Sequence, residues 1–216
     1  MGLRDAQIHD TDLPSRVVEN LYWFGRYAER AESGLRLLRT VFEQLNGIEP
    51  LPPESYICLF KAVTDVTATK PGFFSPSADF SAPETELLDV ITNTNRSGSI
   101  AASLHAMLHS SDGVKELLSS DMHRLSTDIR DGLDQLSVAL RDGLHSAPEE
   151  ALDPIVTTLL ALSGLSQESM VRSRAWRFME IGRRLERSLQ TIKLLRALLV
   201  DPVSPNDPSL MLRPTL

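Results

Sequence analysis

The sequence predicts an all-α fold, a helical bundle with one long helix near each end of the chain. Leu, Ala, Arg, Glu and Gln dominate the segments between breakers, and alternation of β-branched with polar residues is almost absent. Apolar residues also recur at helical spacing over long stretches. The 216 residues, 42% hydrophobic and 24% charged, are enough for one globular domain.

Breakers divide the first part of the chain into helices and a loop. A long helix is expected over residues 14–45, before the sequence Asn-Gly-Ile-Glu-Pro, and a shorter helix over residues 54–69. Residues 70–81 contain two prolines, one glycine and three phenylalanines. This composition predicts a loop that packs its aromatic rings.

The second part is expected to hold helices over residues 98–109, 113–144 and 166–199. Two further helix starts are predicted where Ser81 and Ser146 stand three residues before a glutamate, because this S-x-x-E arrangement is that of a capping box.

Three segments follow from this pattern. Residues 13–200 form the predicted helical domain, residues 1–12 a linker or disordered segment, and residues 201–216, with four prolines, a tail that cannot be regular helix. No apolar run reaches about 18 residues, and the N-terminus lacks the apolar stretch of a signal peptide. We therefore expect a cytoplasmic protein that does not act at a membrane.

Apolar side chains form a stripe along each long helix, with spacings that alternate between three and four residues. The first stripe comprises Val17, Leu21, Phe24, Ala28, Ala31, Leu35, Leu38, Phe42 and Leu45. The second comprises Phe178, Ile181, Leu185, Ser188, Ile192, Leu195 and Leu199, with one polar interruption. Because such spacing is typical of a seam between helices, both stripes are expected to be buried.

The two long helices also resemble each other at an offset of 157 residues. The sequence GRYAER at 25–30 aligns with GRRLER at 182–187, and over residues 25–40 seven of 16 positions are identical. This similarity predicts an internal repeat and a pseudo-symmetric architecture. Convergence of two good helical sequences is the alternative explanation.

The shared Glu-Arg motif falls opposite the apolar stripe on each helix, together with aromatic and acidic residues that a solvated face would rarely display. The candidate site residues of this face are Glu19, Trp23, Arg26, Glu29, Arg30, Trp176, Glu180, Arg183, Glu186 and Arg187. Two interpretations are open. The groups form an ion-pair network that holds the helices together, or their arginines line a pocket for carboxylate or phosphate groups.

Charge excludes some function classes and suggests others. The net charge of −7 argues against a protein that binds nucleic acid over its whole surface. Residues 172–196 nevertheless sum to +6, which predicts attraction of an acidic ligand or partner, or neutralisation by the acidic helices of the same chain.

Reactive side chains are few. The single Cys58 excludes an intramolecular disulfide and lies in an apolar run typical of the core. His105 and His109 lack both the glutamate of an HExxH motif and an evident third ligand, so no metal site is predicted. Arginines beside Glu29 and Glu186 are expected to keep both carboxylates ionised, which does not suit proton transfer near neutral pH.

At this point the sequence resembles a known family. Residues 13–32 (LPSRVVENLYWFGRYAERAE) closely resemble the opening of the bacterial alpha-E proteins, helical proteins named for a Glu-Arg motif. Residues 176–187 (WRFMEIGRRLER) resemble that family's second signature, and residues 98–104 and 118–122 resemble its middle. The resemblance covers about residues 13 to 200.

The resemblance implies a helical protein that is encoded beside, or fused after, a circularly permuted ATP-grasp ligase, an enzyme that forms amide bonds through acyl phosphates. It also implies an association with transglutaminase-like proteases in a peptide synthesis or modification system. No cofactor is expected for this chain, and ATP and Mg²⁺ would enter only through the ligase. Alpha-E proteins usually continue with further helices after the second motif, so this chain is expected to be a shortened form or an excised domain.

Three functions are therefore considered. The first is a non-catalytic accessory or ligand-binding domain that works with an ATP-grasp amide ligase. The second is a structural or oligomerisation module that forms a homo-oligomer, and the third is a peptide-modifying enzyme in its own right. Neither nucleic acid nor membrane is an expected partner.

Overall fold

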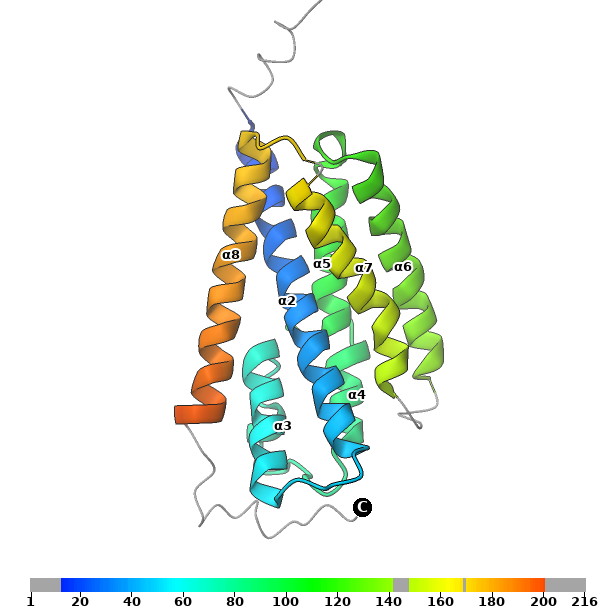
Figure 1. Ribbon diagram of the computed structural model, residues 1–216, viewed down its shortest axis with the longest axis vertical. Helices are drawn as coiled ribbons and strands as arrows, with labels where there is room; N and C mark the ends of the chain where they lie inside the picture. Colours follow the sequence, from blue (N-terminus) through cyan, green and yellow to red (C-terminus); the bar gives the residue numbers. More distant parts are fainter. Residues whose placement is uncertain (1–12, 142–147, 169, 201–216) are drawn as a thin grey trace, which may run out of the picture.

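The computed structural model describes residues 13–141, 148–168 and 170–200, and this part of the chain is an elongated bundle of helices without a β-strand (Figure 1). The long elements are α2 (Ser15–Leu45), α3 (Pro53–Thr67), α4 (Glu84–Thr92), α5 (Ile100–Asp112), α6 (Ser120–Ala139), α7 (Pro148–Glu168) and α8 (Arg174–Leu195). Short 3₁₀ turns, η1 (Gly72–Phe74) and η2 (Lys115–Leu117), lie between them, and α8 continues into a π-helical turn, η3 (Arg196–Val200). The predicted all-α fold is confirmed.

Helix α2 is the centre of the bundle, because it packs against α8, α5, α7 and α3 (Figure 1). Its predicted stripe is buried along most of its length, with Leu21, Leu35 and Leu38 fully inaccessible. Each fully buried leucine contributes roughly 1.5–3 kcal/mol of transfer free energy. The expected burial of this stripe is therefore confirmed.

The aromatic loop packs as expected for two of its three rings. Phe73 and Phe80 are buried and lie 5.0 Å and 6.5 Å from the ring of Phe60 on α3, measured between centroids. The third ring, Phe74, is 44% exposed. The loop thus packs two rings into the core and leaves one phenylalanine on the surface.

Serine caps set three helix starts, but one predicted cap is wrong. Ser99, Ser119 and Ser173 accept hydrogen bonds from the third backbone N–H that follows them and begin α5, α6 and α8. Ser81 does not cap α4, which begins after Pro83, because the Ser81 hydroxyl donates to Asp79 Oδ1 at 2.6 Å. The second predicted cap, at residue 146, lies outside the described residues, as do the proposed end segments 1–12 and 201–216.

The predicted helix over residues 166–199 is wrong at its start. Helix α7 ends at Glu168, and a new helix begins at Arg174 because Ser173 Oγ accepts from the backbone N–H of Trp176. A break of this kind also shortens the predicted helix over residues 113–144, where Ser119 starts α6. In both places a capping serine inside an apolar pattern marks the true boundary.

The predicted burial of the second stripe is also wrong. The side chains of Ile181, Leu185, Ile192 and Leu195 are 43–61% exposed. Helix α8 lies at the edge of the bundle against α2 and α3, and its buried residues are Ala175, Met179, Glu180, Gly182, Glu186 and Gln190. Phe178, the first residue of the stripe, is half-buried and packs against the core. Beyond it, the helix buries its motif face and exposes its apolar stripe.

Candidate functional site

Two glycines allow α2 and α8 to touch backbone to backbone. A Cβ atom on Gly25 would overlap the carbonyl oxygen of Met179 and lie 3.1 Å from the amide nitrogen of Arg183. A Cβ atom on Gly182 would overlap the carbonyl oxygen of Tyr22 in the same way. Because any side chain would push the helices apart, glycine at both positions brings the two Glu-Arg motifs within hydrogen-bonding distance of each other.

The carboxylate of Glu29 on α2 is buried, with 3% of the residue exposed, and it pairs with arginines of α8. Arg187 donates from Nε to Oε1 at 2.6 Å and from Nη2 to Oε2 at 2.8 Å, a bidentate arrangement. The Nε atom of Arg183 lies 3.9 Å from Oε2.

The carboxylate of Glu186 on α8 is equally buried and pairs with arginines of α2. Arg30 donates from Nε to Oε1 at 2.8 Å and from Nη2 to Oε2 at 3.1 Å, and Arg26 Nε also donates to Oε2. Gln190 Nε2 adds a fourth hydrogen bond at 2.8 Å. Every oxygen of this carboxylate is therefore satisfied by the chain itself.

Positions that differ by 157 make equivalent contacts. The bidentate pair of Arg187 with Glu29 matches that of Arg30 with Glu186, and the two glycines exchange equivalent contacts as well. Each helix gives its glutamate to the arginines of the other. This reciprocity is what a pseudo-two-fold arrangement produces, whereas the origin of the similarity in a duplication stays a prediction.

The pairing is strong enough to reverse the effect of burial on protonation. Burial alone would raise the pKa of Glu186, but the hydrogen bonds and positive charges of Arg30 and Arg26 outweigh it and lower the pKa. The hydrogen bond to Glu29 likewise raises the pKa of Arg187. Glu186 is thus held ionised at neutral pH, which does not suit a general acid.

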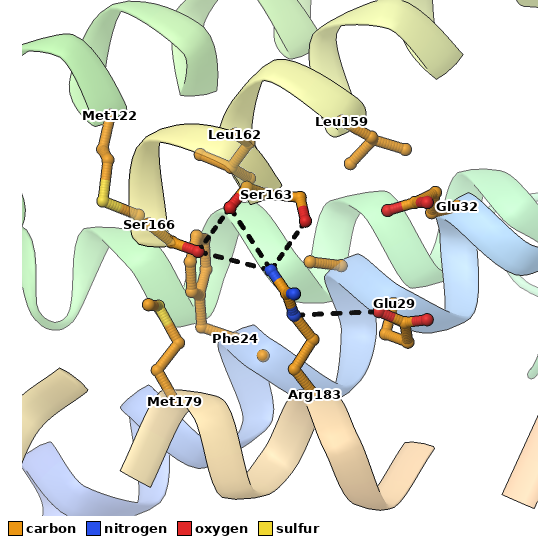
Figure 2. A pocket seen from close by; sticks show the side chains of 12 residues that line it. Phe24, Glu29, Glu32, Met122, Leu159, Leu162, Ser163, Ser166, Met179 and Arg183 are labelled. Carbon is orange, nitrogen blue, oxygen red and sulfur yellow. Dashed lines mark hydrogen bonds and ion pairs between the residues drawn. The ribbon is translucent and has the colours of Figure 1, made fainter. Parts of the chain in front are cut away.

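Arg183 extends the network to α7, as Figure 2 shows. Its Nη1 atom donates to Ser163 Oγ at 2.6 Å and to Ser166 Oγ at 3.3 Å. Its Nε atom lies 3.2 Å from Oε1 of the buried Glu180. The void beside these groups measures only about 20 Å³, enough for about one water molecule. A carboxylate or phosphate ligand does not fit there, so the contacts match the ion-pair network and not the pocket.

The aromatic candidates support the network from its edges. The guanidinium of Arg26 lies 5.6 Å from the ring centroids of both Tyr22 and Trp23. Trp176 is half-buried, and its Nε1 donates to the carbonyl oxygen of Ser166 at 2.8 Å. Glu19 is exposed and is not part of the network. The structure thus brings together nine of the ten predicted site residues.

Sequence reasoning missed one buried carboxyl group, that of Glu32. It lies on α2 one turn beyond Glu29, only 6% of the residue is exposed, and its ion pair with Arg36 is 3.5 Å long. Burial raises its pKa, and repulsion from Glu29 adds to the shift. Its position three residues after Glu29, on the same face of α2, could have indicated this carboxyl group. The repeat did not indicate it, because the equivalent position on α8 is Leu189.

The other reactive residues do not form a second site. Burial raises the pKa of the Cys58 thiol, which donates to the carbonyl oxygen of Ala197 at 3.3 Å, so it is a poor nucleophile. Within the described ranges, no three His, Cys, Asp or Glu side chains gather as a metal site would require, and no helix is long and apolar enough to cross a membrane.

Comparisons with known proteins agree with this geometry. Residues 13–213 match the Alpha-E family, described as a predicted alpha-helical domain with a conserved ER motif. The uncharacterised proteins Rv2567 of Mycobacterium tuberculosis strain H37Rv and Mb2597 of Mycobacterium bovis are each 32% identical over 200 residues, which cover 85% of this chain and 22% of each relative. The chain thus spans about a fifth of the length of the curated relatives it matches, and no solved structure matches it. The paired Glu-Arg helices and the match over nearly the whole chain lead to one conclusion: this protein belongs to the Alpha-E family.

Proposed function

We propose that the chain is a non-catalytic helical module that docks onto a partner through the apolar stripe of α8. The observation that carries the proposal is the exposure of this stripe, from Ile181 at 54% to Leu199 at 73%. Contiguous exposed apolar surface on one helix is typical of an interaction site.

The pseudo-two-fold relation suggests what kind of partner fits. Leu35 on α2 and Ile192 on α8 differ by 157 positions, yet Leu35 is fully buried and Ile192 is 61% exposed. Helices α5 and α7 pack against α2. The stripe of α8 thus lacks, among the described residues, the helical layer that its counterpart has. An apolar face of one or two helices, from a longer protein or from a separate partner, is the occupant that this asymmetry favours.

Charge favours an acidic partner over a second copy of the chain. The only acidic residues of α8, Glu180 and Glu186, are buried in the network, whereas Arg177 is exposed. Arg184 is exposed as well, although its Nε donates to Glu180 Oε2 at 2.9 Å. In a homodimer through this face, the exposed arginines of the two copies would lie close together and repel each other. Helices with acidic residues beside an apolar seam would instead complement them.

The resemblance to the alpha-E proteins supplies a candidate for this partner. An ATP-grasp amide ligase, fused to the module or encoded beside it, would carry the acidic helices, and ATP and Mg²⁺ would bind to that ligase. The chain would then hold the ligase in a peptide synthesis or modification system without taking part in the chemistry. The low pKa of Glu186 supports a role outside proton transfer.

Co-expression with the ATP-grasp protein of the same genome, followed by size-exclusion chromatography with light scattering, tests the proposal. We expect a complex that Ile192→Glu abolishes. The control, Leu160→Glu, changes a leucine on α7 that is 47% exposed and should leave the complex intact. Circular dichroism shows whether both variants fold.

Four results would overturn the proposal. A complex that survives Ile192→Glu would exclude this face, and a complex lost equally in Leu160→Glu would show no preference for it. A stable homodimer that Ile192→Glu dissociates would assign the stripe to a second copy. A monomer that never binds the ligase would exclude the ligase as partner.

A further inference from the structure

An open cleft lies away from the α8 stripe, where α3, the loop that follows it and the end of α8 meet. It measures about 510 Å³ and is lined by Asp65, Ala68, Lys70, Phe74, Lys193 and Arg196. Small-molecule sites usually measure about 300–1,000 Å³. The cleft therefore has room for a small organic molecule beside an amine, which the void next to Arg183 does not.

Lys193 stands half-buried in the lining of this cleft, near the end of α8, and makes no ion pair with any described residue. Two carboxylates attract its ammonium group, but both already pair with other cations. Glu186 binds Arg30 at 2.8 Å, and Oδ1 of Asp65 lies 3.1 Å from Nζ of Lys70. The ammonium form of Lys193 thus gives up part of its hydration without gaining a partner of its own among the described residues.

These surroundings lower the pKa of Lys193. Burial is the largest cause, and repulsion from two neighbouring cations, Arg30 and Lys70, adds to it. Attraction to the two carboxylates opposes the shift without cancelling it. Arg196, the remaining charged group of the lining, is a cation with contacts of its own. Desolvation beside other cations is an arrangement that turns a lysine into a nucleophile, because more of it is present as the neutral amine.

The other three lysines of the chain lie where the ammonium form is stabilised. Lys70 has its ion pair with a carboxylate of α3, and Lys61 lies 6.0 Å from the ring centroid of Phe80. Lys115 is exposed, so water solvates its charge. Lys193 is therefore the lysine whose surroundings favour the neutral amine.

Phe74 gives the cleft an apolar wall. Its ring is 44% exposed, and the Lys70 ammonium lies 5.3 Å from the ring centroid. Ala68 contributes only a methyl group to the lining, so it leaves space beside the ring. An aromatic or apolar group that packs on Phe74 would share the cleft with the Lys193 amine. An uncharged molecule suits this site, because the carboxylate and the other cations of the lining are already engaged.

We propose that Lys193 is a carbonyl-reactive site that binds aldehydes with an aromatic or apolar substituent as an imine. The amine nitrogen adds its electron pair to the carbonyl carbon, and the two amine protons leave with the carbonyl oxygen as water. A C=N bond replaces the C=O bond, and water reverses the reaction without an oxidant or reductant. The site is independent of the proposed docking function, because none of its lining residues belongs to the α8 stripe.

Reductive labelling of the full chain with benzaldehyde and cyanoborohydride, followed by peptide mass spectrometry, tests the site. At about pH 7 we expect Lys193 to be labelled on the order of tenfold faster than the exposed Lys115, which serves as the control within the same chain. The advantage should shrink as the pH rises toward the ordinary lysine pKa of 10.5, where the exposed lysine also becomes neutral. Equal labelling of the two lysines at neutral pH would overturn the proposal.

Two variants test the surroundings of the amine. Lys70→Gln removes a repelling cation and frees the Asp65 carboxylate for Lys193, so the labelling of Lys193 should slow severalfold. Phe74→Ala should slow labelling by benzaldehyde but not by acetaldehyde, which has no ring to pack. Unchanged labelling of Lys193 in Lys70→Gln would overturn the proposed activation, and an unchanged benzaldehyde rate in Phe74→Ala would overturn the preference for aromatic aldehydes. Thermal unfolding without aldehyde shows whether both variants fold.

Discussion

Helices α2 and α8 carry the same pattern in different surroundings. Both have an apolar stripe and a Glu-Arg face, in register at an offset of 157, but α2 buries both faces and α8 buries only the second. Helix α2 has neighbours on several sides, whereas α8 lies at the edge (Figure 1). The difference teaches that the motif, and not the apolar stripe, joins the two helices.

A buried ion-pair network is an unusual way to join helices, because the removal of charges from water opposes the attraction between them. Here each carboxylate receives several donors, and the close backbone contact at the two glycines adds van der Waals attraction. The pairing also selects one partner and one register, since a helix without the motif would leave these groups unpaired.

The largest effect is expected from loss of a buried carboxylate. Glu186→Gln should lower the free energy of unfolding by about 3–5 kcal/mol, since it leaves Arg26 and Arg30 without their counter-charge. Urea denaturation measures this change, and Glu29→Gln should behave similarly because its contacts are equivalent. Glu19→Gln is the exposed control, expected within about 0.5 kcal/mol of the parent. A Glu186→Gln variant as stable as the parent would show that the network does not hold the helices.

Truncation to alanine at equivalent positions of the two stripes should lower the free energy of unfolding by different amounts. Leu35→Ala should cost about 2–5 kcal/mol, because it opens a cavity beside a fully buried side chain. Ile192→Ala should cost less than about 0.5 kcal/mol in the isolated chain, because that side chain is 61% exposed. Equal losses in urea denaturation would mean that Ile192 is covered in solution, for instance by self-association at high protein concentration.

The glycine contact is the next feature to test. Gly182→Ala should destabilise the chain by about 1–3 kcal/mol, because the added Cβ meets the carbonyl oxygen of Tyr22. Gly164→Ala on α7 is a matched control with open space at the Cβ position. It should stabilise its helix by up to about 1 kcal/mol. If both variants gain stability in thermal unfolding, the backbones are not in contact.

The smallest expected change in stability is that of Glu32→Gln, and its pH dependence should be opposite to that of Glu186→Gln. The pKa of Glu32 is raised on folding, so its charge destabilises the protein at neutral pH, and Glu32→Gln should stabilise it by about 1 kcal/mol. This gain should vanish as the pH falls below about 4.5, where the carboxyl group is protonated in both states.

Glu186 provides the opposite case. Its pKa is lowered on folding, so its contribution is present above the ordinary glutamate pKa and is lost as the pH falls through the folded value. Chemical denaturation between about pH 3 and 7 measures both effects. At neutral pH we expect Glu32→Gln to have a higher free energy of unfolding than the parent and Glu186→Gln a lower one. A Glu32→Gln variant that loses stability at pH 7 would show that its ion pair with Arg36 outweighs its burial.

Much of the local structure follows from the sequence alone. The alternation of three and four places the buried stripe of α2, the breaker at residues 46–50 ends that helix, and the Glu-Arg face marks a second contact. The predicted start of the last helix failed at Ser173, because a serine cap inside a helical pattern is hard to distinguish from an ordinary polar position.

What only the tertiary structure decided is which partner each face meets. An apolar stripe indicates that a helix can bury that face, but burial requires a neighbouring element. For the stripe of α8, no described helix is that neighbour. The pairing of Glu29 with Arg187 and of Glu186 with Arg30 joins residues more than 150 positions apart, and it depends on how closely two glycines let the backbones approach. Sequence patterns are local, whereas ion pairing and burial depend on distances in space, so the motif was readable from the chain and its role only from the fold.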